Sequence, residues 1–93
     1  MTSYQRGETV SERAYIYTEA DVLVNSDEIT ITIIDPSGTT IIDEDYFTIE
    51  AIGTYVYSYT LSETAEIGLW LMIVKATLSD IVKIRNDSFR VTN

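Results

Sequence analysis

GTYVYSYTL, residues 53–61, separates its large apolar side chains from its small ones by strict alternation. Tyr55, Tyr57, Tyr59 and Leu61 fall on one parity, and Thr, Val and Ser occupy the other. Because successive side chains of a strand point to opposite faces, this pattern predicts a strand with one apolar face and one wet face. We expect the three tyrosines to pack inward with their hydroxyls at the rim of the core; an exposed tyrosine platform for a ligand is the alternative.

The same period of two recurs on both sides of this stretch. Asp35-Pro-Ser-Gly38 fits a type I turn between two strands, and a second turn is expected near Ser79-Asp80. Residues 1–7 are expected to be a lead-in that ends at Gly7, and 43–45 a solvated connection. No segment keeps a helical period, so about seven short strands predict one all-β domain over residues 1–93, a sandwich or a small barrel. The expected strands are residues 8–17, 28–34, 39–42, 46–49, 53–61, 69–77 and 81–92.

Taken in chain order, the motifs resemble those of immunoglobulin-like β-sandwiches, and the chain is similar to macroglobulin-type and bacterial or archaeal surface Ig-like modules. The shared features are Tyr4, Gly7, Glu8 and Val10 at the opening, Ile31 and Ile33 before Pro36 and Gly38, the tyrosine strand, Gly68 with Trp70, and Phe89 with Val91. The resemblance implies an approximately seven-stranded antiparallel Ig-like sandwich. It also implies a non-catalytic role, because such modules serve as spacers, surface modules, parts of assemblies and small virion proteins.

Composition narrows the range of partners. The net charge is -9, from 15 acidic and 6 basic residues, which disfavours binding to nucleic-acid phosphates. No run of about 18 apolar residues is present, so no membrane insertion is expected. The opening residues, MTSYQR, lack an apolar core, and we expect no secretory signal in this chain.

The residues that usually carry out catalysis are scarce. The chain has no His and no Cys, so it lacks the commonest general base and the usual ligands of zinc and copper. Asp43, Glu44 and Asp45 are candidates for a calcium site, but adjacent acids on an extended segment point apart, and a solvated loop is the competing interpretation. Glu12 interrupts the apolar parity of residues 8–17 and is expected near a strand end or a rim. We therefore expect no enzyme activity, catalytic residue, metal or cofactor.

The strand at residues 69–77 carries the clearest functional indication. With Trp70 inward, Leu71 and Ile73 must point outward, although sandwich strands normally present polar residues there. A partner subunit covers them in one interpretation; in the other, the loop at 22–24 covers them within the monomer. Ile34 and Ile41 are expected on the same patch, and Tyr15 and Tyr17 on an exposed face of the first strand. The predicted interface residues are Leu71, Ile73, Ile34, Ile41, Tyr15 and Tyr17.

These features predict a structural or assembly protein that binds other protein subunits. We expect a virion component of a phage or archaeal virus, such as a head-decoration, neck or tail-associated subunit, with capsid or tail proteins or further copies of itself as partners. A spacer or adhesin module of a bacterial or archaeal cell-surface protein, outside the cell, is one alternative. A carbohydrate-binding module that uses exposed tyrosines is the other.

Overall fold

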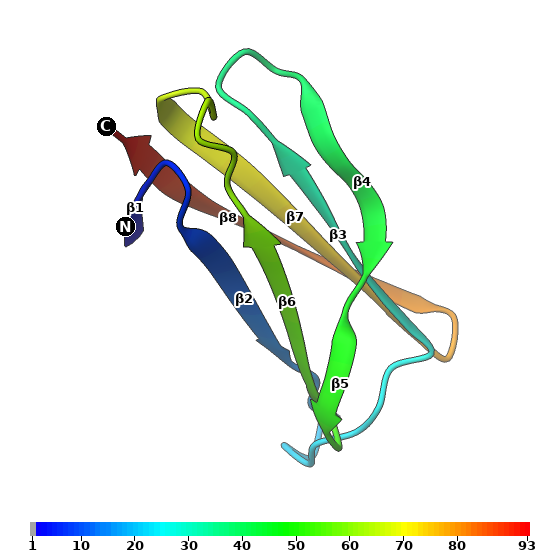
Figure 1. Cartoon of the computed structure of the whole chain (residues 1–93). Coiled ribbons are helices and arrows are strands. Elements are labelled where there is room, and N and C mark those ends of the chain that lie inside the picture. The colour runs from blue at the N-terminus through cyan, green and yellow to red at the C-terminus, as the bar shows by residue number, and fades with distance from the viewer. Residues whose placement is uncertain (1) are drawn as a thin grey trace.

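Eight strands in two facing sheets make up the computed structural model, which describes residues 2–93 (Figure 1). The large sheet has five strands in the order β1-β8-β7-β3-β4, and the small sheet has three in the order β2-β6-β5. Neighbouring strands are antiparallel except β1 and β8, which pair in parallel. The predicted all-β, mostly antiparallel sandwich is confirmed. The strands are β1 (Thr2–Gln5), β2 (Thr9–Tyr15), β3 (Glu28–Ile34), β4 (Thr40–Tyr46), β5 (Thr48–Ala51), β6 (Thr54–Thr60), β7 (Gly68–Leu78) and β8 (Ile81–Thr92).

The expected lead-in is in fact a strand, and it raises the count from about seven to eight. β1 pairs with the last residues of β8, from Thr2 opposite Phe89 to Gln5 opposite Thr92. The ring of Tyr4 meets the ring of Phe89 edge-on, with centroids 5.6 Å apart. The residues of β1 show no apolar alternation. Pairing with β8, at the other end of the chain, holds this short strand in the sheet.

The long hairpin of β7 and β8 is the largest element of the sandwich. Ser79 and Asp80 have φ angles of 48° and 65°, so both turn residues are left-handed, as in the type I′ turns that fit the twist of a two-residue hairpin. Leu78 lies opposite Ile81, and the register continues without a shift to Gly68 opposite Val91. The predicted turn at Ser79-Asp80 is confirmed.

β4 runs through the acidic triplet that we expected to be a connection. The strand covers Thr40–Tyr46, and its register with β3 shifts on either side of Ile33. Glu44 has a φ of 46°, which marks a local irregularity in the strand. At such an irregularity, the edge strand contains extra residues that have no partner on β3. Their charged side chains stay in solvent while the rest of the strand remains paired, so an acidic stretch can form part of β4.

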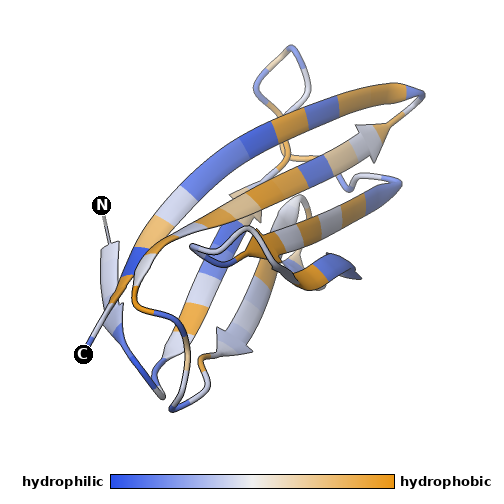
Figure 2. Ribbon diagram, turned by 90° about the horizontal axis from the view of Figure 1, so that it is seen from above, coloured by the Kyte–Doolittle hydropathy of each residue, from blue (hydrophilic) through white to orange (hydrophobic). Residues whose placement is uncertain are grey.

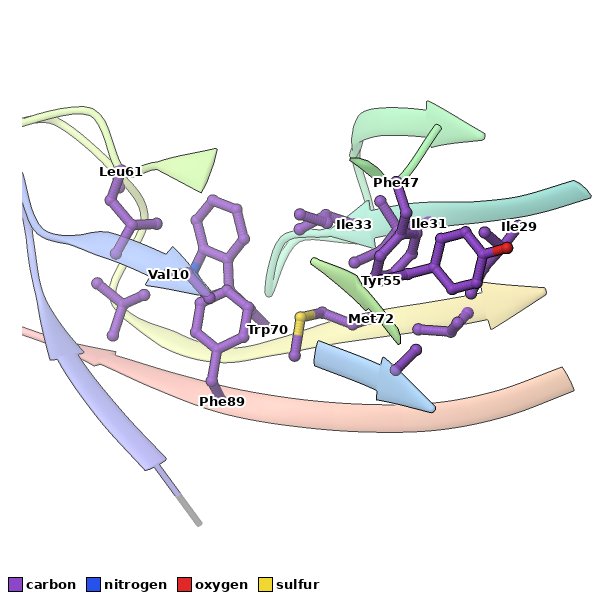
Figure 3. Packing of buried hydrophobic residues seen from close by; sticks show 14 residues of the cluster. Val10, Ile29, Ile31, Ile33, Phe47, Tyr55, Leu61, Trp70, Met72 and Phe89 are labelled. Carbon is purple, nitrogen blue, oxygen red and sulfur yellow. The ribbon is translucent and has the colours of Figure 1, made fainter. Parts of the chain in front are cut away.

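The core lies between the two sheets and is filled mainly by inward-facing residues of β2, β3, β6, β7 and β8. Trp70 stacks on Phe89 with ring centroids 5.7 Å apart, and both are almost fully buried (Figure 3). Tyr55 is buried, and Tyr57 and Tyr59 pack against the cluster, so their predicted inward orientation is confirmed. Among the described residues no helix is long and apolar enough to span a bilayer. The buried apolar residues are Val10, Ala14, Ile29, Ile31, Ile33, Phe47, Tyr55, Leu61, Ala65, Trp70, Met72, Val74, Phe89 and Val91.

The loop between β2 and β3 closes one end of the sandwich at Gly53. Ile16 N–H donates to the Gly53 carbonyl (2.8 Å), and Val24 N–H donates to the Ile16 carbonyl (3.0 Å). Gly53 N–H in turn donates to Asn25 Oδ1 at 2.8 Å. Within the segment at 22–24 of this loop, Val24 is half-buried while Val22 stays exposed. These bonds hold the loop against the turn between β5 and β6.

Candidate functional site

An aliphatic patch occupies the outer face of the large sheet. Trp70 and Met72 of β7 point into the core, so Leu71 between them points outward and is 45% exposed. Leu71 lies directly opposite Ile34 of β3, and Ile73 follows two positions along the same strand. The predicted outward orientation of Leu71 and Ile73 is confirmed, although Ile73 is half-buried. We call this surface the outer patch, and it consists of Leu69, Leu71, Ile73, Ile34 and Ile41.

Ile41 reaches the outer patch through the irregular register of β4. It lies between Thr40, which pairs with Ile34, and Ile42, which pairs with Ile33 and packs on the core. Ile41 itself is 37% exposed. The register therefore brings Ile34, Ile41, Leu71 and Ile73 together at one end of the sheet, as the sequence predicted.

Polar residues border the outer patch on the β8 side. Leu69, Leu71 and Ile73 lie opposite Arg90, Ser88 and Asn86, respectively. An aliphatic centre with a polar margin is the usual composition of a protein interface. Leu69, which is 40% exposed, was not singled out from the sequence, although it shares the parity of Leu71 and that signal was available.

Tyr15 and Tyr17 do not belong to the outer patch. Both are exposed, and they stand at the far end of β2, where Tyr17 forms an isolated bridge with Leu23. There they flank a groove of about 660 Å³ between the end of β2 and the β7–β8 hairpin. We call this second surface the edge groove. Its apolar floor is formed by Ala14, Ile16, Val74, Ala76 and Leu78.

Glu12 occupies the middle of β2, opposite Tyr57, and the expectation of a strand end is wrong. β2 is nevertheless an edge strand, and the Glu12 side chain, only 12% exposed, turns toward β8, where Arg85 Nη2 lies 3.5 Å from Glu12 Oε2. Burial raises the pKa of the Glu12 carboxyl, the Arg85 guanidinium opposes that rise, and the nearby Asp87 carboxyl adds to it. The pair links the two sheets across their open side. Arg85 also lines the edge groove.

The acidic triplet of β4 does not converge on one point. Asp45 Oδ2 accepts a hydrogen bond from the Tyr57 hydroxyl at 2.8 Å, whereas Glu44 Oε1 lies 3.7 Å from Lys75 Nζ on another strand. Over residues 2–93, no group of three or more acidic side chains could hold a metal ion.

The hydroxyls of Tyr55 and Tyr57 do reach the rim, since Tyr55 Oη accepts the Ser26 N–H at 3.0 Å.

We expect Tyr57 to titrate at a higher pH than an ordinary tyrosine. Burial, the hydrogen bond to Asp45 and the charge of that carboxylate raise the pKa of Tyr57 to about 12. Unfolding returns it to the ordinary value near 10, so the unfolded state loses this proton first. The contribution of Tyr57 to the free energy of unfolding is therefore fully present below about pH 10 and decreases as the pH rises toward 12. Absorbance titration at 295 nm should show one late step, which Asp45→Asn moves to lower pH; an unchanged late step in that variant contradicts the assignment.

Comparison with solved structures identifies the architecture. An Escherichia coli alpha-2-macroglobulin activated by porcine elastase matches with a TM-score of 0.73 and 24% identity, over 96% of this chain and 8% of that one. A Salmonella alpha-2-macroglobulin reacted with methylamine matches with a TM-score of 0.75 and 24% identity, over 98% of this chain and 6% of that one. The Lin-41 filamin domain matches with a TM-score of 0.71 and 16% identity, over 98% of this chain and 83% of that one.

These likenesses establish the fold, an Ig-like or filamin-like β-sandwich, and the predicted resemblance to macroglobulin-type modules is confirmed. The chain spans less than a tenth of the macroglobulins it matches, so it corresponds to an Ig-like domain of the kind found within larger proteins. No protein-family model and no curated protein matches the sequence.

Proposed function

We propose that this chain is a non-enzymatic Ig-like module that binds other protein subunits through the outer patch. The observation that supports this most directly is Leu71, which is 45% exposed beside Ile34 on a strand whose inner face is fully used by the core. Covering Leu71 and Ile73 in an interface would contribute about 3–5 kcal/mol. The β2–β3 loop, which could have covered them, is instead bonded to Gly53 through Ile16 and Asn25.

The proposal extends to the setting in which the module works. A structural subunit of a phage or archaeal-virus particle would use such a patch to contact capsid or tail proteins or other copies. A spacer or adhesin module of a cell-surface protein would use it against neighbouring domains, and the likeness to domains of much longer chains supports this second setting. The neighbouring genes and the full reading frame separate the two: capsid and tail genes favour the virion, and a long repeat-bearing frame favours the surface protein.

Leu71→Asp and Ile73→Asp are each expected to weaken association at least about tenfold and to leave the monomer folded. Each change places a charge where an interface would exclude water. Ile52→Asp is the matched control, because Ile52 is 67% exposed in the turn between β5 and β6, away from the outer patch. Light scattering after size exclusion, over a concentration series, measures association, and circular dichroism measures folding. Association that survives both patch variants removes the outer patch as the binding surface.

A further inference from the structure

The β8 strand has a free edge along most of its length. Only its last residues, Phe89–Thr92, pair with β1, and within residues 2–93 no strand pairs with Ile81–Ser88 on the side away from β7. Figure 2 shows this long hairpin extending away from the part of β8 that lies beside β1. An unpaired row of backbone N–H and C=O groups is a template for another strand.

The backbone groups that face this edge follow from the hairpin geometry. A two-residue turn makes Leu78 and Ile81 a hydrogen-bonded pair, and bonded and non-bonded pairs then alternate along the ladder. Val82, Ile84, Asn86 and Ser88 therefore direct their N–H and C=O groups outward. The Ser88 N–H already donates to its neighbour Asp87 Oδ1 at 2.8 Å, so the edge offers the amides of Val82, Ile84 and Asn86 to another chain.

The other free edge of the large sheet is less suited to pairing. β4 has two register shifts and a left-handed residue, Glu44, which distort its row of backbone groups. β8 shows no register shift from Ile81 to Val91. The contrast leaves β8 as the regular, accessible edge of this sheet.

The edge groove lies along the same part of β8. Ile81, Lys83 and Arg85 line one side of the groove, and its floor is the apolar surface of Ala14, Ile16, Val74, Ala76 and Leu78. Val82 and Ile84 alternate with these residues along the strand and are 51% and 63% exposed, and Ile84 also contributes to the lining of the groove. A strand added to this edge would therefore place one face over the edge groove and the other beside Val82 and Ile84.

The charged side chains of β8 indicate which kind of strand could pair with its free edge. The free segment Ile81–Ser88 carries Lys83 and Arg85 against Asp87, so its net charge is 2 − 1 = +1 in a chain whose net charge is -9, and Arg85 also lies 3.5 Å from the Glu12 carboxylate. Two antiparallel registers would overlay two copies of the whole free segment. One places Lys83 opposite Arg85 of the second copy, twice by symmetry; the other pairs Lys83 with Asp87 twice and places the two Arg85 side chains opposite each other once. Like charges in opposite positions destabilise a pair of strands, and each register with a second copy contains at least one such pair, whereas acidic residues opposite Lys83 and Arg85 form favourable pairs at both positions.

We propose that the β8 edge at Ile81–Ser88 binds an extended segment of a partner protein as an added strand, and that this segment alternates apolar and acidic residues. Its acidic side chains lie beside Lys83 and Arg85 at the edge groove, and its apolar side chains lie beside Val82 and Ile84. Main-chain hydrogen bonds hold the segment, and the alternating side chains select it. This binding surface is separate from the outer patch and does not depend on it.

A terminally blocked peptide of alternating Val and Glu, as long as the free segment and fluorescently labelled, is the probe. We expect saturable binding by fluorescence anisotropy below about 1 mM, with NMR amide shifts centred on Val82, Ile84 and Asn86. A peptide with Lys in place of every Glu should bind at least about tenfold more weakly, since its charges would lie beside Lys83 and Arg85. A peptide with a central Pro should also lose binding, because Pro cannot donate to the ladder.

Two pairs of protein variants test the backbone and the charge separately. Ile84→Pro removes a backbone N–H that faces the free edge and none that bonds β7, so it should weaken peptide binding about tenfold. Ile84→Thr keeps this N–H and should bind the peptide more strongly than the Pro variant. Lys83→Glu should weaken binding about tenfold, whereas Lys75→Glu, the same change on the outer face of β7, should have little effect. Circular dichroism checks folding, and Val82→Pro replaces Ile84→Pro if that variant unfolds.

Three results would overturn the proposal. The first is no binding of the Val–Glu peptide up to about 1 mM. The second is binding that Lys83→Glu and Lys75→Glu reduce equally, which would indicate general electrostatic attraction. The third is an NMR shift map centred on β4 or on the outer patch. Leu71 lies outside the β8 edge, so the Leu71→Asp variant should still bind the peptide. Failure of the association test and failure of the peptide-binding test can therefore be told apart.

Discussion

Trp70→Ala is expected to lower the free energy of unfolding by about 3–5 kcal/mol, a large part of the roughly 5–15 kcal/mol that holds a small domain together. Trp70 is 2% exposed and stacks on Phe89, so truncation leaves a cavity at the centre of the core. Its Nε1–H also donates to the Glu66 carbonyl at 2.8 Å, and that acceptor loses its partner. The chain has no disulfide to offset the loss.

Urea denaturation followed by circular dichroism measures this effect. Leu71→Ala is the matched control, because Leu71 is the next residue of β7 and faces solvent; we expect a loss under about 1 kcal/mol there. Trp70→Phe should fall between the two, since it keeps an aromatic ring beside Phe89 but cannot donate to Glu66. A larger loss from Leu71→Ala than from Trp70→Ala would mean that the assignment of faces along β7 is reversed.

Gly53→Ala is expected to cost about 2–4 kcal/mol. Gly53 has a φ of 68°, and a Cβ added there would lie 2.8 Å from Val24 N and 3.0 Å from the Ile16 carbonyl oxygen. Both contacts are with backbone, which cannot rotate away as a side chain can. The substitution would push the β2–β3 loop off the turn between β5 and β6, and it would disturb Tyr17, which flanks the edge groove.

Gly38→Ala separates crowding from backbone strain. Gly38 has a φ of 90°, but a Cβ there would meet nothing within 4 Å, so only the conformational cost of about 1 kcal/mol applies. Thermal and urea unfolding of the two variants should therefore differ by at least about 1 kcal/mol. Equal losses would show that the loop moves aside at Gly53 without cost.

Local pattern was enough to predict much of the architecture and one surface. The alternation of residues 53–61 and 69–77 placed Tyr55 and Trp70 inside and Leu71 outside, because side-chain direction along a strand depends only on neighbouring positions. The turns at Asp35–Gly38 and Ser79-Asp80 could also be predicted, since turn residues favour particular conformations of their own backbone.

Other features could not be read locally. β1 shows no alternation and depends on pairing with β8 at the opposite end of the chain, and the acidic triplet joined β4 through an irregular register. Tyr15 and Tyr17 were grouped with Leu71 as interface residues, but the fold places them beside the edge groove. The partial burial of Glu12 against Arg85 also joins residues that are distant in the sequence.

The sequence by itself determined most of the strands, apart from β1 and the acidic part of β4, as well as where the tight turns fall and which face of β7 is dry, because backbone geometry and turn chemistry act over a few residues. Only the tertiary structure decided that Ile81–Ser88 keeps a free edge, that Lys83 and Arg85 line a groove there, and that Ile34 lies opposite Leu71. Those features depend on which strands become neighbours. That choice follows from burial over the whole chain, and no local pattern encodes it.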